Sequence, residues 1–258
     1  MNKLPISVVL ITYNEQENIK RTLEAIKDFA SEIIIVDSHS TDNTRQIAKS
    51  QGAIVYEEDW KGYREQKNSA LRKATNEWIL SIDADEVITN ELKEEIANVI
   101  ANPQADGYFI NRRTVFLGKK LKYALYPDRQ LRLVKQKANP IWTGGSVHEL
   151  LKIDGKTAQL KGYVLHYSYR DLNDYILRLN KYARLWAEDA LRKNKKPNIN
   201  RLIISPLTAF IKNYFLKLGL LDGMRGFIVS CATSYYSLLK GFYLWEKITE
   251  NKEHKEKY

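Results

Sequence analysis

The first 90 residues alternate between short apolar runs rich in β-branched residues and longer segments with helical spacing, and this alternation most limits the folds open to the chain. The apolar runs lie at residues 6–11, 33–36, 53–56 and 78–82, and the helix-like segments at 15–29, 43–51 and 63–74. Such an order is typical of a parallel sheet with helices on both faces. We therefore expect an α/β, Rossmann-like fold that binds ligands at the carboxyl ends of its strands.

Polar residues follow three of the predicted strands. They are TYNE at 12–15, DSHS at 37–40 and DADE at 83–86. Because the carboxyl ends of parallel strands share one edge of a sheet, we expect these segments to lie side by side, and we call this edge the rim. Tyr13 offers a ring for stacking on a base, and Asp37 offers an acceptor for a base or ribose. Lys67, on the following helix, is expected to reach a base or a phosphate.

Three acids, Asp83, Asp85 and Glu86, end a run that has the apolar character of a buried strand. Carboxylates there repel one another and lose hydration, and a divalent cation would relieve both costs. Mg²⁺ and Mn²⁺ commonly bind through one or two carboxylates plus substrate phosphates, so we predict a metal on Asp85 and Asp83 that also binds a diphosphate. Two alternatives stay open: an aspartate that caps the next turn, and a phosphoryl-accepting Asp83, although that motif normally closes the first strand of its fold.

The second half of the chain has a different pattern. After a helix expected near 91–101, short strand candidates follow at 107–112, 130–134, 147–152 and 159–165, which favours a mixed sheet. From residue 171 the chain is helical, with Tyr175, Leu179, Tyr182 and Trp186 on one stripe. We expect a catalytic domain over 1–170, a helical region over 171–246 and a charged tail over 247–258. Within the domain, 1–90 is the nucleotide-binding half and 91–170 the acceptor-side half.

The basic charge is concentrated near the C-terminus. Of the net charge of +10, residues 178–240 hold 12 basic and 3 acidic residues, whereas residues 1–177 hold 25 and 24. The surplus lies among bulky aliphatic residues and not in an aromatic and basic groove, so we expect no nucleic-acid partner, although a nucleic-acid-binding protein remains a distant alternative. The single cysteine excludes an intrachain disulfide and fits a reducing compartment, and we expect a cytoplasmic location.

The segment 201–246 carries a narrow polar stripe, and its other faces are crowded with large apolar residues. No run is long and uncharged enough to span a bilayer. We expect amphipathic helices that place the region 178–246 peripherally on the anionic inner membrane. The alternative is that they pack on the catalytic domain or on a second subunit, as a homo-oligomer.

Seven segments together resemble bacterial family 2 glycosyltransferases of the GT-A fold, and among these the lipopolysaccharide core glucosyltransferases. They are TYNE (12–15), VDSHSTDNT (36–44), DWKGYREQKNSA (59–70), WILSIDADE (78–86), YPDRQLRL (126–133), GGSVHE (144–149) and LKLGLLDG (216–223). The resemblance implies that a uridine pocket is lined by Thr12, Tyr13, Asn14 and Glu15. It further implies that Asp37 contacts the uracil or ribose, that Asp85 ligates the metal and that Asp83 lies near the ribose. Lys67 stands where most members have an arginine.

The same resemblance assigns the general base to Glu149. At this position the family usually has a Glu-Asp pair, whereas this chain has His148-Glu149. One carboxylate base without a nucleophile implies inversion at the anomeric carbon. His166 is expected to complete the metal shell or touch the diphosphate, and His148 to lie on the acceptor side. Arg129 and Arg132 are expected to face outward from one strand and bind acceptor phosphates.

The sequence thus predicts a metal-dependent hexosyltransferase that moves a sugar, expected to be glucose, from a UDP-sugar to a lipopolysaccharide inner-core or similar lipid-linked acceptor. A polyprenyl phosphate or another cell-surface glycan is the alternative acceptor.

Overall fold

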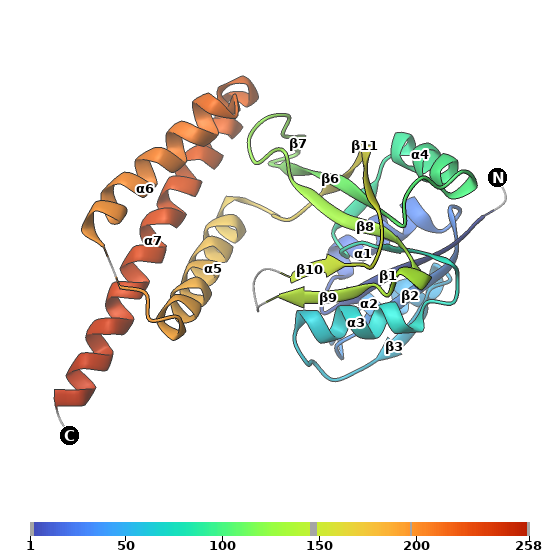
Figure 1. Cartoon of the computed structure of the whole chain (residues 1–258), viewed down its shortest axis with the longest axis horizontal. Helices are drawn as coiled ribbons and strands as arrows, with labels where there is room; N and C mark the ends of the chain where they lie inside the picture. The colour runs from blue at the N-terminus through green and yellow to red at the C-terminus, as the bar shows by residue number, and fades with distance from the viewer. Residues whose placement is uncertain (1–2, 145–148, 197, 257–258) are drawn as a thin grey trace. The chain divides into compact units, whose positions relative to one another are not determined.

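The computed structural model describes residues 3–144, 149–196 and 198–256 of the chain. The chain forms two compact units (Figure 1). Unit 1 comprises Met1–Arg113 and Pro127–Tyr167, and unit 2 comprises Thr114–Tyr126 and Ser168–Tyr258. The C-terminal helices therefore share their unit with residues 114–126, a segment that the sequence pattern places in the acceptor-side half.

Four parallel strands form one half of the sheet in unit 1: β1 Leu4–Thr12, β2 Ala30–Asp37, β3 Ile54–Glu57 and β4 Trp78–Ser81. The strand β1 lies between β2 and β4, with Ile11 opposite Val36 and Val8 opposite Leu80. The strands β1, β2 and β4 form because β-branched side chains fit a pleated surface that is buried on both faces, whereas β3, at the edge of the sheet, is mostly exposed. The predicted parallel half is confirmed.

The other half of the sheet is mixed, with β5 Glu86–Ile88, β6 Gly107–Phe116, β8 Arg129–Lys135 and β11 Thr157–His166. Here β8 pairs antiparallel with β4, β6 with β8, and β5 with β11. The order among the described strands is β3-β2-β1-β4-β8-β6-β11-β5. The predicted mixed sheet is therefore confirmed, and β11 brings His166 opposite Glu86.

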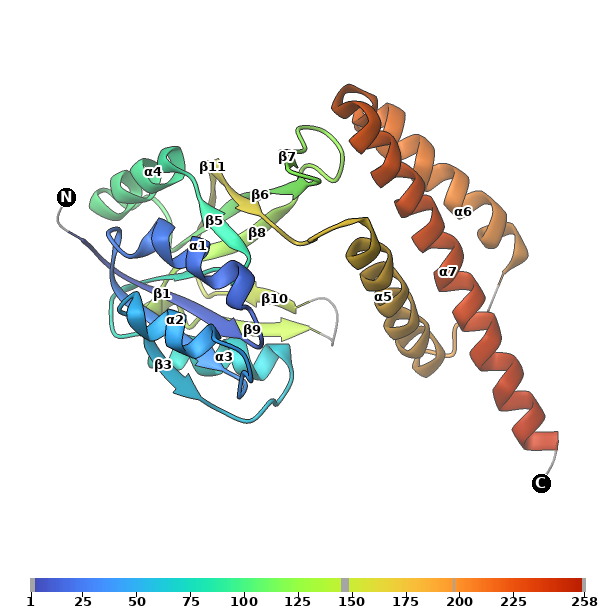
Figure 2. The ribbon, with the colours of Figure 1, turned by 180° about the vertical axis from the view of Figure 1, so that it is seen from behind.

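Helices cover both faces of the sheet, as predicted (Figures 1 and 2). On one face lie α1 Gln16–Ile26, α2 Thr44–Ser50 and α4 Asn90–Ala101. On the other face lie α3 Tyr63–Lys73 and a hairpin of β9 Ile141–Gly144 and β10 Glu149–Lys152, preceded by the short 3-10 turn η1 Gln136–Ala138. On the α4 side Gly162 of β11 allows close approach, because a Cβ there would lie 2.8 Å from the Leu92 Cα.

Unit 2 contains, in the part of the chain that is described, the long helices α5 Leu172–Arg192, α6 Ile199–Ile211 and α7 Gly223–Glu256. Two turns join α6 to α7: a π-helical turn, η2 Lys212–Leu216, and a 3-10 turn, η3 Gly219–Asp222. The short strand β7 Lys119–Lys120 lies in the other segment of this unit, Thr114–Tyr126. Both α5 and α6 pack along α7 (Figure 1). No helix among the described residues has the length and apolar character needed to cross a bilayer.

The buried residues of α5 are Tyr175, Ala183, Ala187 and Ala190, so the predicted stripe coincides with the buried face only in part. Leu179 and Trp186 of that stripe pack against core clusters of the unit, whereas Tyr182 is 37% exposed. Alanine lets helices approach closely. The helix α7 continues to Glu256, so the described residues of the expected tail from residue 247 are helical, and the boundary at 246 stays a prediction. No glycine or proline follows Gly241 to end the helix.

The carboxylate of Asp222 connects two distant parts of unit 2. It accepts hydrogen bonds from the backbone N–H groups of Lys122, Tyr123 and Ala124, with N···O distances of 2.8, 2.9 and 2.8 Å. The neighbouring turn is tight, since a Cβ on Gly226 would lie 1.8 Å from the Gly219 carbonyl oxygen. Asp222 therefore fixes residues 122–124 against the start of α7.

We expect Asp222→Ala to lower the free energy of unfolding by about 2–4 kcal/mol, because three N–H groups lose a charged acceptor. Asp222→Asn, which keeps one acceptor oxygen, should lose less. Urea denaturation measures both. Asp189→Ala is the control, because this carboxylate makes only a 3.7 Å ion pair with Arg192 near the surface. Equal losses for Asp222→Ala and Asp189→Ala would contradict the proposed role.

Candidate active site

The rim is assembled as the sequence predicts, because β1 lies between β2 and β4 and their carboxyl ends are neighbours. Thr12, at the end of β1, donates its hydroxyl hydrogen to Asp37 Oδ2 over 2.6 Å. Ser40 donates to the same carboxylate from its backbone N–H to Oδ1 over 2.7 Å and from its hydroxyl to Oδ2 over 2.6 Å. These bonds tie the loops after β1 and β2 together.

Asp37 itself is fully buried. Both of its oxygens already accept hydrogen bonds from Thr12 and Ser40. A contact between Asp37 and a base or ribose stays a prediction, and it would require this buried carboxylate to become accessible. In this structure the side chain holds the rim in shape.

The loop after β1 turns sharply at Asn14. Its φ of 53° lies in the left-handed region, which asparagine tolerates better than most residues. Asn14 accepts from the Thr41 backbone N–H over 2.8 Å, and its own N–H donates to the Ser40 hydroxyl over 2.9 Å. This turn leaves Tyr13 59% exposed on the rim. Glu15 follows as the N-cap residue of α1, and its N–H donates to the Thr44 hydroxyl over 2.8 Å.

Two of the three acids after β4 are neutralised by the protein's own cations. Arg132 Nη2 lies 2.8 Å from Asp83 Oδ2 and 3.1 Å from Glu86 Oε1. Lys67 Nζ lies 3.1 Å from Asp83 Oδ1, so this lysine reaches an aspartate at the rim. Arg112 stands 3.6 Å from Glu86 and 3.7 Å from Asp83, and it also pairs with Asp128 at 2.8 Å.

This network explains why carboxylates are tolerated at the end of a buried strand. Glu86 is fully buried and Arg132 is 2% exposed, so neither charge has water to screen it. Burial alone would raise the pKa of Asp83, but Arg132 and Lys67 outweigh it and hold the pKa well below its usual value. Burial alone would lower the pKa of Arg132, and Asp83 and Glu86 reverse this, so that the pKa is raised.

Asp85 is placed differently from the other two acids. In the described part of the chain its ion-pair partner is His166, whose Nε2 lies 3.4 Å from Asp85 Oδ2. Burial would raise the pKa of Asp85 and lower that of His166, but their attraction outweighs burial, so the pKa of Asp85 is lowered and that of His166 raised. Both side chains keep 18% of their surface exposed. Asp85 is therefore largely buried and differs from Asp83, whose side chain is 25% exposed, in its partner and not in its exposure.

The chemistry of Asp85 and His166 fits a divalent cation shared with a substrate. They supply one carboxylate and one imidazole, and Mg²⁺ or Mn²⁺ commonly takes few protein ligands and completes its shell with substrate phosphates and water. Among the described residues, no group of three or more His, Cys, Asp or Glu side chains is arranged to hold a metal alone. Lys67 and Arg132 already pair with the oxygens of Asp83, so a metal ligated by Asp83 would have to compete with them, and this ligand stays a prediction.

The hairpin β9–β10 places Glu149 at the start of β10, opposite Gly144 and half-buried. A two-way contact fixes this hairpin, since the Asn68 amide donates to the Trp142 carbonyl over 3.1 Å and accepts from the Trp142 N–H over 2.8 Å. Trp142 also lies under Lys67, whose Nζ is 4.5 Å from the indole ring. His148 lies outside the described residues.

One predicted orientation is wrong. Arg129 is exposed, as expected, but Arg132 points inward to Asp83 and Glu86. The strand β8 is covered on both faces, so side chains that alternate between its two faces do not reach solvent on either one. The pattern also missed Arg112 and Asp128, although a buried acid cluster is itself a signal that buried cations must lie nearby.

The family profile of glycosyl transferase family 2 matches residues 7–150, which is more than half of the chain. The chain belongs to this family. It is 30% identical over 258 residues to the lipopolysaccharide core biosynthesis glycosyltransferase LpsC of Rhizobium meliloti, with 95% of this chain and 93% of the relative covered. It is also 32% identical over 247 residues to an uncharacterized glycosyltransferase of Rickettsia typhi, with 91% and 85% covered. The enzyme is therefore a family 2 glycosyltransferase.

Solved structures confirm the GT-A fold. The mannosyltransferase PcManGT of Pyrobaculum calidifontis, in complex with GDP-Man and Mn²⁺, aligns with a TM-score of 0.56 at 16% identity, covering 95% of this chain and 88% of that one. TarS 1–349 of S. aureus, in complex with UDP-GlcNAc, aligns with a TM-score of 0.51 at 15% identity, covering 96% and 92%.

We expect Arg132→Met to lower the free energy of unfolding by about 3–5 kcal/mol, because the change leaves buried carboxylates unpaired. Arg129→Met, an exposed arginine on the same strand, is the matched control and should change it by about 0.5 kcal/mol or less. Chemical denaturation measures both.

The double variant Arg132→Met/Glu86→Gln separates pairing from packing. The double variant should lower the free energy of unfolding by less than the sum of the two single variants, because each single variant leaves a buried charge without its partner and the double variant removes both charges. Additive losses would show that the pair is not coupled.

Proposed function

We propose that this family 2 enzyme transfers a hexose, with glucose as the first candidate, from a UDP-sugar to a lipopolysaccharide inner-core saccharide or a similar lipid-linked acceptor. The observation that carries the proposal is the arrangement after β4. There the protein neutralises Asp83 and Glu86 internally and leaves Asp85 beside His166 at the rim.

The named relatives support the donor and acceptor classes. LpsC, named for lipopolysaccharide core biosynthesis, matches nearly the whole chain, which favours a related acceptor here. TarS binds UDP-GlcNAc, and PcManGT binds GDP-Man with Mn²⁺, which favours a nucleotide-sugar donor and a divalent metal. A polyprenyl phosphate or another surface glycan is the alternative acceptor.

In the proposed reaction, Asp85 and His166 would hold Mn²⁺ or Mg²⁺, which would supply positive charge for the departing diphosphate. Lys67 pairs with Asp83 at 3.1 Å, so a diphosphate would have to replace this carboxylate to contact the lysine. The exposed ring of Tyr13 offers a stacking surface for the uracil, and Thr12, Asn14, Glu15 and Asp37 shape its pocket.

We assign the general base to Glu149. An acceptor hydroxyl is far too weak an acid to ionise at neutral pH, so a carboxylate must take its proton as it attacks the anomeric carbon. One base and no nucleophile give a single displacement, and an α-linked donor would yield a β-linked product. Arg129, which is exposed at the start of β8, remains the candidate for an acceptor phosphate. His148, which precedes the base in the sequence, is the second candidate on the acceptor side.

We further propose that unit 2 binds the cytoplasmic face of the inner membrane peripherally. Three apolar side chains on α6, Ile203, Ile204 and Leu207, are 62%, 56% and 60% exposed. The basic surplus of the chain lies in the same region, which suits a surface of anionic lipids. Association of a second copy through these helices is the alternative.

Asp85→Asn should lower transfer by on the order of 100-fold or more, because a lost metal ligand costs at least as much as a lost outer-shell contact. It should also weaken Mn²⁺ binding in the presence of UDP, which calorimetry measures without turnover. Glu94→Gln, an exposed acid on α4, is the control and should change neither. Normal Mn²⁺ binding by Asp85→Asn would remove this residue from the metal site.

Glu149→Gln should lower turnover by roughly 10²–10⁴-fold, the usual contribution of a general base, while UDP-sugar binding is retained. Glu149→Asp keeps a carboxylate and should retain more activity than the amide. A pure enzyme with a panel of UDP-sugars and core acceptors gives the rate and the product, and proton NMR gives the anomeric configuration. Retention of configuration, or lost donor binding in Glu149→Gln, would contradict the assignment.

A further inference from the structure

The end of unit 2 where α6 leads into α7 carries a dense group of exposed apolar residues. Leu216, Leu221 and Met224 are 75%, 56% and 71% exposed. Four more large apolar residues of this stretch are also exposed: Phe215, Leu218, Leu220 and Phe227. We call residues 215–227 the apolar tip. So many large apolar side chains gathered on one surface indicate contact with an apolar partner.

The backbone of the apolar tip is hydrogen-bonded within itself. The N–H groups of Lys217, Leu218 and Leu221 each donate to a carbonyl three to five residues earlier, over 2.8, 3.1 and 2.9 Å. The turn is also tight, because a Cβ on Gly219 would lie 2.5 Å from the Asn213 carbonyl oxygen. Unpaired backbone groups are costly in hydrocarbon, so a hydrogen-bonded turn can enter a bilayer where an irregular loop could not.

A segment from the middle of the chain lies against the apolar tip. Asp222 accepts from the N–H groups of residues 122–124, and Arg225 donates from Nε and Nη2 to the Leu117 carbonyl over 3.2 and 2.9 Å. In Figures 1 and 2 the loop that carries β7 lies beside the end of unit 2 where α6 and α7 meet. This loop presents three exposed lysines: Lys119, Lys120 and Lys122.

The charge at this end of unit 2 is mostly positive. Segments 114–126 and 211–227 together contain six basic residues and one acid, Asp222, which is engaged with backbone N–H groups. The acids at the start of α5 are engaged as well, since Asp171 accepts from the Asp174 N–H over 2.7 Å and Asp174 pairs with Arg178 at 3.1 Å. Two copies that met at this end would bring like charges together, whereas a surface of anionic lipids would attract them.

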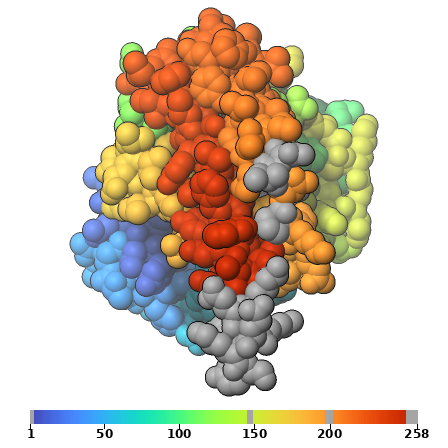
Figure 3. All heavy atoms as spheres, turned by 90° about the vertical axis from the view of Figure 1, so that its left-hand side faces the viewer, coloured from blue at the N-terminus to red at the C-terminus, as the bar shows by residue number. Residues whose placement is uncertain are grey.

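We propose that the apolar tip inserts between the lipids of an anionic membrane and that the lysines of residues 119–122 lie at its head groups. The inference rests on the proposed membrane contact of unit 2, and it adds to that contact a segment that lies 100 residues from Asp222 in the sequence. The exposed stripe of α6 leads into the tip, because Ile204, Leu207 and Ile211 precede Phe215 at steps of three or four residues. Figure 3 shows α6 and α7 side by side on the surface of this unit.

The full-length protein is floated with vesicles of phosphatidylcholine alone and of phosphatidylcholine with equimolar phosphatidylglycerol. Leu216→Gln/Met224→Gln should weaken binding to both kinds by about 100-fold, at roughly tenfold for each large side chain that no longer enters the apolar phase. Phe242→Gln/Trp245→Gln is the matched control, because these residues are 52% and 59% exposed on α7 next to Leu244, which packs with the last turns of α5. The control should change binding by about twofold or less.

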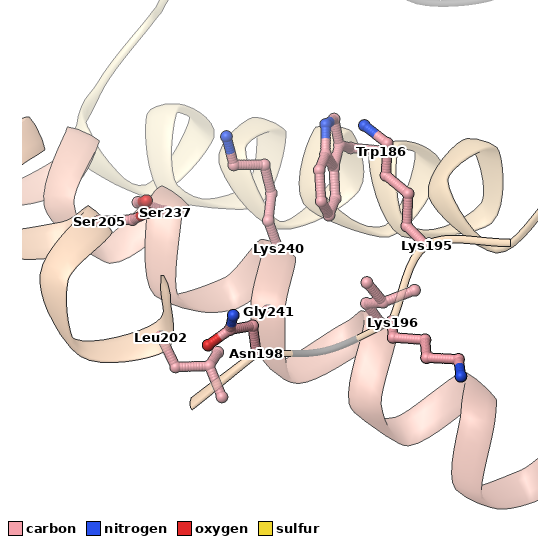
Figure 4. Close-up of a pocket in the computed structure, with 10 residues that line it drawn as sticks. Trp186, Lys195, Lys196, Asn198, Leu202, Ser205, Ser237, Lys240 and Gly241 are labelled. Atoms are coloured by element: carbon pink, nitrogen blue, oxygen red, sulfur yellow. The ribbon is translucent and has the colours of Figure 1, made fainter. Parts of the chain in front are cut away.

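The lysines of the middle segment are tested separately. Lys119→Ser/Lys120→Ser should weaken binding to the anionic vesicles by about 25-fold, at roughly fivefold per lysine, and leave binding to phosphatidylcholine unchanged. Lys195→Ser/Lys196→Ser removes the same charge after the last turn of α5, where both lysines line a pocket among α5, α6 and α7 (Figure 4). This control pair should lose about fivefold or less.

A fluorescent label measures the insertion itself. The single cysteine, Cys231, is replaced by serine, and Leu216→Cys or Phe242→Cys then carries a dye that responds to polarity. With anionic vesicles, the emission of the dye at position 216 should shift to shorter wavelength and be quenched by lipids that carry a nitroxide on the acyl chain. The emission of the dye at position 242 should not change.

Equal losses in the two apolar pairs, or equal shifts of the two labels, would show that unit 2 lies along the membrane over its whole length. They would overturn the apolar tip and leave the membrane contact intact. If the wild type floats with neither kind of vesicle, the membrane contact and the apolar tip fail together. If Leu216→Gln/Met224→Gln separates a dimer in light scattering and does not change flotation, the tip is an interface between copies and the lipid assignment is wrong. Turnover on a delipidated acceptor tests the sugar transfer alone, whichever of these results is found.

Discussion

The ion pairs of Arg132 with Asp83 and Glu86 are the interaction on which the active site depends. A parallel strand buried on both faces must end where the ligand binds, and in this chain it ends in three acids. Without cations from β8 and β6, those carboxylates would be protonated or would force the loop into water. Because Arg132, Arg112 and Lys67 neutralise two of them, the third, Asp85, keeps a lowered pKa with His166 as its partner although it is largely buried.

The sequence predicted the parallel half and the rim because their determinants are local. Each β-branched run is followed within a few residues by its own polar turn, and parallel order then brings the turns together. The cations were not predictable in the same way. Arg132 lies 49 residues from Asp83 and 46 from Glu86, and only the pairing of β4 with β8 brings them into contact. The pattern of a single sequence shows which residue types are present, but it does not show which residues of β4 and β8 lie opposite one another.

The same distinction applies to the rest of the site. His166 reaches Asp85 because β11 pairs antiparallel with β5, with His166 opposite Glu86. Glu149 is placed by a hairpin whose position depends on Asn68 of α3 through two hydrogen bonds to Trp142. The resemblance to family 2 could nominate Glu149, and the end of a predicted strand could nominate His166. The sequence could not show that one side chain of α3 supports the hairpin while the adjacent Lys67 pairs with Asp83.

Packing among the helices of unit 2 does not account for all of the large apolar residues in this unit. The inner sides of its helices are satisfied by one another, with Ala183 and Ala187 of α5 and Val229 and Leu244 of α7 all buried. The turn η2 leaves Phe215 and Leu216 52% and 75% exposed, and the start of α7 leaves Met224 71% exposed. Water-facing positions rarely gather so many large apolar side chains unless another surface covers them. Since most of the chain's basic surplus lies in this unit, an anionic and partly apolar surface matches it better than a neutral protein surface does.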